Sequence, residues 1–293
     1  MVKLIAIDMD GTLLTPEHSI TPRTILAINK ALEQGIQVVI ATGRAFYEAH
    51  GIVREYDLKI PYICLNGAQI RNEQHEIEEN YPMNNDLITE VTDVFKSEDV
   101  FYQIYTDKAI YTTSIERDID IFIELAEQSG GDPDVEKIRR LMRERIAKTS
   151  LKEVDNYREI YEREDEHVLK FLAASSNKPK LVRTKSYLNE IDQLAVSASS
   201  YGNIEVTRKG AQKGIALEKM AEELNVDLKD AMAIGDNLND ISMLKRVGTA
   251  VAMGNATSEV KAIADVVTGT NIEDGVATAI ENILNSEYEN TAK

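Results

Sequence analysis

At 293 residues the chain is long enough to bury a substantial core, as one large domain or as two of ordinary size. Its net charge of −17 argues against nucleic acid and an anionic membrane surface as partners, because both would repel the protein. No apolar run approaches the ~20 residues that a membrane-spanning helix needs. Asp8 and Asp10 interrupt the apolar start of the chain, where a signal peptide would be unbroken. We therefore expect a cytoplasmic protein.

Short, unbroken apolar runs recur in the first and last parts of the chain. Such runs are typical of strands that are buried on both faces of a parallel sheet. The predicted strands are residues 3–8, 36–41, 61–66, 231–236, 249–253 and 265–268.

Helical patterns lie between these strands. The first has Thr21 as a candidate N-cap, Pro22 at the first helical position and Gly35 as a stop signal. Two more are predicted at residues 213–224 and 274–284. Alternating strands and helices predict a doubly wound α/β core with a Rossmann-like parallel sheet. The last residues, 286–293, are expected to fray.

The middle of the chain has a different pattern. It combines aromatic and β-branched runs around a TDKA turn, which predict a hairpin, with helical segments and a stretch of interspersed charges. We expect helices near 86–97, 117–128 and 180–190, a solvated helical stretch within 132–166, and strands within 101–113, 167–174, 193–199 and 203–207. The sequence thus predicts a core of residues 1–82 and 208–293 with an inserted α+β domain at 83–207.

The single cysteine, Cys64, excludes an internal disulfide, and its apolar neighbours favour a buried structural thiol. The four histidines are too far apart in sequence to suggest a zinc site. The sequence specifies no oligomeric state.

Polar clusters follow several of the predicted core strands or begin a helix nearby. They are residues 8–12, 42–44, 213–214 and 235–240. Because ligands of open α/β sheets bind beyond the carboxyl ends of the strands, one crevice could gather all four clusters.

Four carboxylates in such a crevice, those of Asp8, Asp10, Asp236 and Asp240, could not all stay charged without a counter-ion. Hard oxygen ligands favour Mg²⁺ over zinc. A calcium loop of the EF-hand type is disfavoured, because Leu238 stands at its third position and its sixth position holds no glycine. A magnesium site in turn suggests phosphate chemistry.

The remaining clusters supply donors for phosphate oxygens. Thr42 and the backbone amides that follow it, beginning with Gly43, are expected at a helix start, and Lys213 adds a full positive charge at another helix N-terminus. Metal and donors together would stabilise charge on a phosphoryl group. One N-terminal aspartate could then be a metal-bound nucleophile and the other could carry a proton.

The motifs DMDGT, ATGR, a Lys-Gly helix start and GDNLND, in that order and spacing, resemble the haloacid dehalogenase superfamily. More closely, the chain resembles the Cof-like phosphohydrolases, which carry a large α/β cap of type IIB between the second and third motifs. The resemblance implies that Asp8 attacks phosphorus to form an aspartyl-phosphate, while Asp10 protonates the leaving oxygen and later deprotonates water. It also implies that Asp8, Asp236 and the backbone carbonyl of Asp10 bind Mg²⁺.

The same resemblance assigns the other positions. Thr42, Lys213 and Asn239 should bind the phosphoryl group, and Asp240 should order metal-bound waters or Lys213. Asn66-Gly67 matches a family position that lines the crevice, although Asn-Gly is also an ordinary turn. Arg44 could contact substrate or make an ordinary salt bridge.

These features predict a magnesium-dependent phosphatase whose partner is a small phosphorylated metabolite, such as a sugar phosphate. An alternative is a phosphosugar mutase or phosphotransferase that uses the same phosphoaspartate. A receiver-like phosphoacceptor is disfavoured by the second aspartate, by the GDNLND cluster and by the large insertion. The sequence does not identify the substrate or the residues of the insertion that select it.

Overall fold

The computed structural model describes residues 1–128, 133–199 and 202–285, so the segment 286–293 that was expected to fray lies outside the described residues. Two compact units are present: Met1–Glu79 joined with the C-terminal part from Ala211, and Asn80–Gly210. The insertion expected at 83–207 falls within the second unit. Each unit has its own sheet and core.

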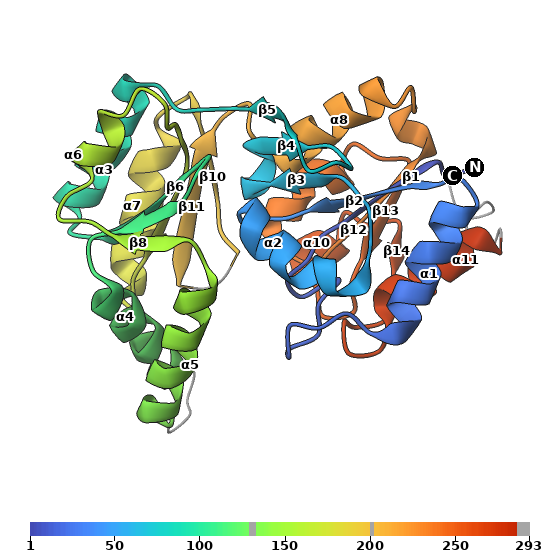
Figure 1. Cartoon of the computed structure of the whole chain (residues 1–293), viewed down its shortest axis with the longest axis horizontal. Helices are drawn as coiled ribbons and strands as arrows, with labels where there is room; N and C mark the ends of the chain where they lie inside the picture. The colour runs from blue at the N-terminus through green and yellow to red at the C-terminus, as the bar shows by residue number, and fades with distance from the viewer. Residues whose placement is uncertain (129–132, 200–201, 286–293) are drawn as a thin grey trace. The chain divides into compact units, whose positions relative to one another are not determined.

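The sheet of the first unit has the strand order β14-β13-β12-β1-β2-β3-β4-β5 (Figure 1). Neighbouring strands from β14 to β3 are parallel, and β4 is antiparallel to β3. The six predicted core strands are confirmed, whereas β4 and β5 were not predicted. The strands are β1 Leu4–Ile7, β2 Gln37–Ala41, β3 Tyr62–Cys64, β4 Gln69–Arg71, β5 Ile77–Asn80, β12 Ala231–Gly235, β13 Thr249–Ala252 and β14 Val266–Val267.

Helices complete a doubly wound α/β arrangement, as the sequence predicted. The Thr21 side chain caps the first helix and Pro22 occupies its first turn, so the expected start is confirmed. The first and last helices of the unit pack on each other, while α8 contacts α9 and β3. The helices are α1 Pro22–Glu33, α2 Phe46–Val53, α8 Lys213–Glu223, α9 Ile241–Leu244, α10 Ser258–Lys261 and α11 Gly275–Leu284.

The chain order reverses at β1, and this reversal positions the site. From β1 the chain proceeds to β2 and β3 on one side, while β12, β13 and β14 follow each other on the opposite side. Residues Leu4–Ile7 of β1 are fully buried, which explains their unbroken apolar run. Ligands of such sheets bind beyond the strand ends at the reversal, so the residues after β1 and β12 share one crevice.

The second unit, Asn80–Gly210, is an α+β fold with the strand order β10-β11-β9-β6-β7-β8 (Figure 1). Each pair of neighbouring strands along the sheet from β10 to β7 is antiparallel, whereas β7 and β8 are parallel. The antiparallel pair of β6 and β7 confirms the predicted hairpin. The strands are β6 Phe101–Thr106, β7 Ile110–Thr112, β8 Leu151–Glu153, β9 Val168–Ala174, β10 Leu194–Ser197 and β11 Asn203–Arg208. The helices are α3 Asn85–Ser97, α4 Ile115–Gln128, α5 Val135–Lys148, α6 Arg158–Tyr161 and α7 Lys178–Asn189.

This unit has a separate hydrophobic core between its sheet and helices. Phe95 of α3, Phe171 of β9 and Leu188 of α7 are among its fully buried members. The stretch of interspersed charges forms α5 and α6, which agrees with the helical stretch expected there, and also contains β8, which was not predicted.

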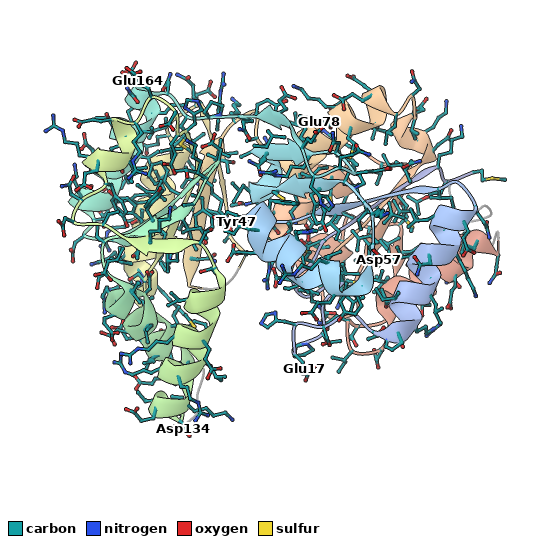
Figure 2. The ribbon with its side chains drawn as sticks, in the orientation of Figure 1. Glu17, Tyr47, Asp57, Glu78, Asp134 and Glu164 are labelled. Carbon is teal, nitrogen blue, oxygen red and sulfur yellow. The ribbon has the colours of Figure 1, made fainter. Side chains whose placement is uncertain are left out.

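Acidic side chains lie at the surface of both units (Figure 2), which agrees with the net charge of −17. The exposed acidic residues labelled there are Glu17, Asp57, Glu78, Asp134 and Glu164. Among the helices that the structure describes, none combines the length and the apolar character that crossing a membrane requires. Cys64 is buried and unpaired, and burial raises the pKa of its thiol to about 12.

Candidate active site

Two buried aspartates meet at the point where the strand order reverses. Asp8 directly follows β1, and its backbone N–H donates to the Ile234 carbonyl of β12 at 3.0 Å. Asp236 follows the end of β12, and both aspartate side chains are buried. The parallel register of β1 and β12 therefore brings carboxylates 228 positions apart in sequence to the same edge of the sheet.

Lys213 lies between Asp8 and a third carboxylate, Asp240. Its Nζ is 2.5 Å from Asp8 Oδ1 and 2.7 Å from Asp240 Oδ1, and its side chain is 0% exposed. Asp240 Oδ2 accepts the backbone N–H groups of Asp236 at 2.9 Å and Asn237 at 3.0 Å. Asp240 thus holds Lys213 with one oxygen and the loop after β12 with the other.

Burial and like charge perturb this cluster. Burial raises the pKa of Asp8 well above its usual range, and the Asp240 carboxylate raises it further. Burial also raises the pKa of Asp236 to about 6, again with a contribution from Asp240. Burial alone would lower the pKa of Lys213, but the carboxylates of Asp240 and Asp8 raise it above its usual range. The lysine is therefore charged, and it does not fully offset three buried carboxylates.

This excess of buried negative charge suits a divalent cation. Oxygens of Asp8, Asp236 and Asp240 lie within 4.8 Å of one another. Because both oxygens of Asp240 already accept hydrogen bonds, Asp8 and Asp236 are the better ligands of the three. The carboxylate of Asp10 is not part of this cluster, and the metal role predicted for its backbone carbonyl stays a prediction. The residues fit a hard cation with oxygen ligands.

Thr12 and Gly11 shape the site, although the sequence reasoning gave them no role. The Thr12 hydroxyl donates to Asp236 Oδ1 at 2.8 Å in a buried contact. Gly11 has φ of +81°, and a Cβ atom there would lie 2.5 Å from Asp236 Oδ2. Only glycine allows the loop to approach the carboxylate so closely. The signal was the Gly-Thr pair directly after the second aspartate.

Asp10 forms an ion pair with Arg44. Arg44 Nη2 lies 2.5 Å from Asp10 Oδ1, and Arg44 Nε lies 2.7 Å from Asp10 Oδ2. Sequence reasoning expected Arg44 to contact substrate or make an ordinary salt bridge, and did not predict Asp10 as its partner. Asn255, which sequence reasoning also missed, donates its side-chain amide to the neighbouring Gly11 carbonyl at 2.8 Å.

The expectation that Thr42 and Gly43 lie at a helix start is wrong. The buried Thr42 hydroxyl accepts the Arg44 N–H at 3.1 Å, which closes a short turn instead of capping a helix. Helix α2 begins later, at Phe46. Thr42 and Gly43 still follow β2, beside β1 in the sheet, so their place at the strand ends agrees with the prediction.

Asn66, Gly67 and Asn239 come together in the same unit. The Asn239 amide donates to Asn66 Oδ1 at 3.1 Å. Gly67 has φ of +99°, and a Cβ atom there would lie 2.5 Å from the Gln212 backbone. The turn at 65–67 therefore contacts the residue directly before Lys213 and also reaches the GDNLND loop. Their chemical roles stay predictions.

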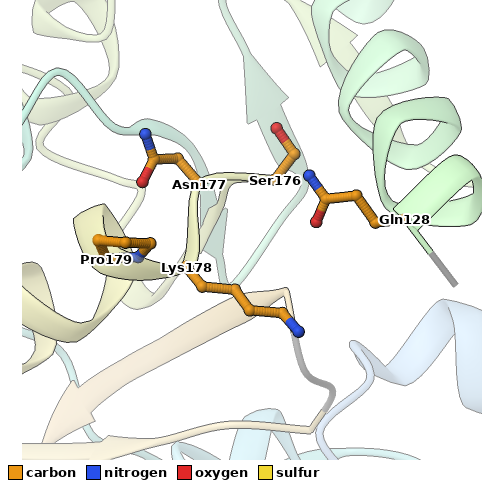
Figure 3. Close-up of a pocket in the computed structure, with 5 residues that line it drawn as sticks. All are labelled: Gln128, Ser176, Asn177, Lys178 and Pro179. Carbon is orange, nitrogen blue, oxygen red and sulfur yellow. The ribbon is translucent and has the colours of Figure 1, made fainter.

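A separate pocket of about 600 Å³ belongs to the unit Asn80–Gly210 (Figure 3). Two of its polar side chains already serve the fold: Asn177 caps α7 by accepting the Lys180 N–H, and Ser176 donates to Glu124. The lining residues include no carboxylate. This pocket lacks the acidic groups that the candidate site concentrates after β1 and β12.

Comparison with known proteins finds similar chains. A model of the haloacid dehalogenase-like hydrolase family matches residues 5–280. Phosphatase YwpJ of Bacillus subtilis is 31% identical over 285 residues, which cover 97% of this chain and 100% of the relative. The 5-amino-6-(5-phospho-D-ribitylamino)uracil phosphatase YcsE of the same organism is 32% identical over 281 residues, covering 96% and 95%. The solved structure of a haloacid dehalogenase-like hydrolase from B. subtilis has a TM-score of 0.86 at 30% identity, covering 96% and 100%.

Proposed function

The chain belongs to the haloacid dehalogenase-like hydrolases, and from that membership we propose that it is a magnesium-dependent phosphatase of small phosphate monoesters that uses Asp8 as its nucleophile. Membership confirms the family resemblance noted in the sequence and makes the chain a hydrolase acting on phosphoric monoesters. The observation that carries the proposal is the buried cluster in which Lys213 lies between Asp8 and Asp240, beside Asp236.

Asp8 is the residue we assign to the first step. One carboxylate oxygen attacks phosphorus, so an Oδ–P bond forms as the P–O bond to the leaving group breaks. The Lys213 ammonium at 2.5 Å holds the other oxygen and fixes the orientation of the carboxylate. Both Lys213 and the end of β1 restrain the nucleophile, so it can meet phosphorus in line.

Asp10 is the residue we assign to proton transfer. Its side chain is 51% exposed and lies outside the buried cluster, so it differs from Asp8 in both environment and access to solvent. In the first step its carboxyl group, in the protonated form, gives its proton to the leaving oxygen and becomes a carboxylate. In the second it takes a proton from water as the water oxygen bonds to phosphorus and the Asp8–P bond breaks.

Asp8, Asp236 and the Asp10 carbonyl are the groups we assign to Mg²⁺. The bound ion would neutralise part of the cluster's charge and stabilise negative charge on the phosphoryl oxygens. Asp240 holds Lys213 and the loop after β12, while Thr12 fixes Asp236.

The phosphoryl oxygens are assigned to Lys213, the Asn239 amide, Thr42 and the Gly43 N–H. Charged and neutral donors of this kind stabilise the transferring group without forming bonds to it. Asn66 accepts a hydrogen bond from Asn239, which directs that amide at the loop after β3.

The inserted unit is assigned as the cap that recognises the leaving group. It enters the chain between β5 and α8. The name of the relative YcsE specifies a phosphorylated ribityl compound, which supports a polyol or sugar phosphate as the substrate class. The cytoplasmic location expected from the sequence stays a prediction.

Phosphate release from 4-nitrophenyl phosphate tests the proposed function. We expect turnover with Mg²⁺, its loss on chelation, and its loss in Asp8→Asn, because an amide is a far poorer nucleophile. Asp57→Asn removes an exposed carboxylate from the same unit and should leave activity unchanged. Full activity in Asp8→Asn would refute the assignment. Tracking free phosphate against isomer with a hexose phosphate would separate hydrolysis from the mutase alternative.

Thermal unfolding gives a second readout of the metal assignment. Any ligand that binds only the folded state raises the unfolding temperature. Mg²⁺ should therefore stabilise the protein, and Asp236→Asn should remove most of that shift while Asp57→Asn keeps it. An equal Mg²⁺ shift in both variants would contradict the assignment.

A further inference from the structure

Arg44 binds both oxygens of the Asp10 carboxylate. The contacts are Nη2 to Oδ1 at 2.5 Å and Nε to Oδ2 at 2.7 Å, which is the parallel two-bond geometry of a guanidinium on a carboxylate. The Arg44 side chain is 12% exposed, whereas that of Asp10 is 51% exposed. A largely buried arginine thus reaches out to an accessible carboxylate.

The backbone of Arg44 is fixed on both sides. Its N–H donates to the Thr42 hydroxyl at 3.1 Å, and its carbonyl accepts the Leu65 N–H at 3.0 Å. Leu65 has φ of +51°, a strained backbone conformation for a bulky residue that its surroundings must enforce. The His18 ring nitrogen Nδ1 lies 3.2 Å from the guanidinium. Arg44 is therefore held in place independently of Asp10.

We propose that Arg44 is a positioning residue for Asp10. It holds the half-exposed Asp10 side chain in the orientation needed for proton transfer to the leaving oxygen. This inference rests on the proposed function. Each oxygen of Asp10 has its own guanidinium contact, so the oxygen that carries the proton can exchange its arginine contact for the leaving group. The other contact then keeps the carboxylate in register.

An ordinary surface ion pair would have a different consequence. Arg23 and Glu281 form one in the same unit, with contacts of 2.6 and 3.3 Å and an arginine that is 47% exposed. Such exposed pairs contribute little to stability and have no necessary effect on chemistry. A direct contact between Arg44 and the substrate phosphate, the other possibility, would affect all phosphate esters alike.

Leaving-group dependence separates these cases. Phenyl phosphate and 4-nitrophenyl phosphate are nearly the same size, but phenolate leaves poorly and therefore needs the proton from Asp10 more than 4-nitrophenolate does. We expect Arg44→Gln to lower kcat/KM about 10- to 100-fold for phenyl phosphate and less than about 5-fold for 4-nitrophenyl phosphate. The larger loss is the size expected when a catalytic group is misplaced by about 1 Å. Asp10→Asn should show the same selectivity, more strongly. Arg44→Lys should recover only part of the loss, because an ammonium cannot make two parallel bonds.

A double-mutant cycle tests the coupling between the two residues. In the Asp10→Asn background, Arg44→Gln should cause little further loss, because its effect acts through Asp10. Arg23→Gln is the matched control and should leave both substrates unaffected. If Arg44→Gln does not fold, as judged by circular dichroism, Arg44→Lys carries the same test.

Equal losses on the two esters, or a full additional loss in the Asp10→Asn background, would overturn the inference and indicate a direct substrate contact. An unchanged kcat/KM in the Arg44 variants would also overturn it. The proposed function fails separately, if the unaltered protein releases no phosphate or if Asp8→Asn keeps full activity.

Discussion

Replacing Lys213 by Met removes the only charge that the structure places between Asp8 and Asp240 in the described residues, while keeping a side chain of similar length. Lys213 is 0% exposed, and the side chains of its partners are 7% and 0% exposed. Breaking a buried ion pair from one side typically costs about 3–5 kcal/mol, because the remaining charge is left uncompensated. Since Lys213 serves two carboxylates, we expect a cost at the upper end of that range.

Lys219→Met is the matched control on the same helix. Lys219 Nζ contacts Glu79 at 2.7 and 2.9 Å, but the two side chains are 39% and 36% exposed. Pairs that face solvent contribute about 0–1 kcal/mol, so similar distances should give a much smaller loss. The comparison separates burial from contact geometry.

Calorimetric unfolding of both variants in the presence of a chelator measures these costs. At about 2–4 °C per kcal/mol for domains of this size, we expect the unfolding temperature of the unit that contains α8 to fall by about 10–20 °C in Lys213→Met and by a degree or two in Lys219→Met. Phosphatase activity should be lost only in Lys213→Met. Equal shifts in the two variants would refute the reasoning that burial makes the Lys213 pairs strong.

Further outcomes follow from individual positions. Gly67→Ala should destabilise the protein by roughly 2–4 kcal/mol, from a positive φ and a Cβ atom 2.5 Å from the Gln212 backbone. Gly35→Ala, also at positive φ but with open space around it, should cost only about 1 kcal/mol; equal costs in thermal unfolding would contradict this. Burial raises the pKa of Asp118 to about 6, so its carboxyl holds a proton more tightly when folded, and stability is lost as pH rises from about 4 to about 6. Asp118→Asn should therefore raise the free energy of unfolding by up to about 3 kcal/mol at pH 7.5 and by almost nothing below about pH 4. The control Asp120→Asn, at a half-exposed ion pair with Arg139, should give no such gain. An effect of Asp118→Asn that does not depend on pH would contradict burial as the cause.

The core strands were predictable because a strand that is buried on both faces has an unbroken run of apolar residues in the sequence. Residues 4–7 are uniformly apolar and fully buried in β1. The start of α1 was equally clear, since Thr21 and Pro22 satisfy the backbone at its first turn. Strand β5 was missed because its residues, Ile77–Asn80, are polar, exposed or half-buried and lie at the sheet edge. The strand propensity of residues at a sheet edge gives no such apolar pattern in the sequence.

The local structure at the site was less predictable than its composition. The type of residue after each strand predicted an acidic crevice, and the clustered carboxylates of Asp8, Asp236 and Asp240 agree with it, whereas phosphate binding there stays a prediction. The start of α2 was placed too early, because Thr42 caps the Arg44 N–H in a turn and Glu48 accepts the Ala45 N–H at the true helix start. A threonine before a helix looks the same in either case.

Pairings across the site depended on the topology. Asp10 and Arg44 are 34 positions apart, and nothing in the spacing of either motif indicates that they meet. Strands β1 and β2 are adjacent and parallel, so the loops that follow them emerge side by side. The contact between Asp10 and Arg44 depends on that adjacency, and the conformations of the two side chains determine whether it forms.

The phosphorylated enzyme is the most direct test of the central claim, that Asp8 accepts the phosphoryl group. The protein would be mixed with a phosphate monoester and Mg²⁺, quenched in acid within the first turnover, digested and analysed by mass spectrometry. We predict a phosphoryl group on the peptide that contains Asp8, and none in Asp8→Asn. Full turnover with no phosphoryl group on that peptide, or with the group on another residue, would contradict the account.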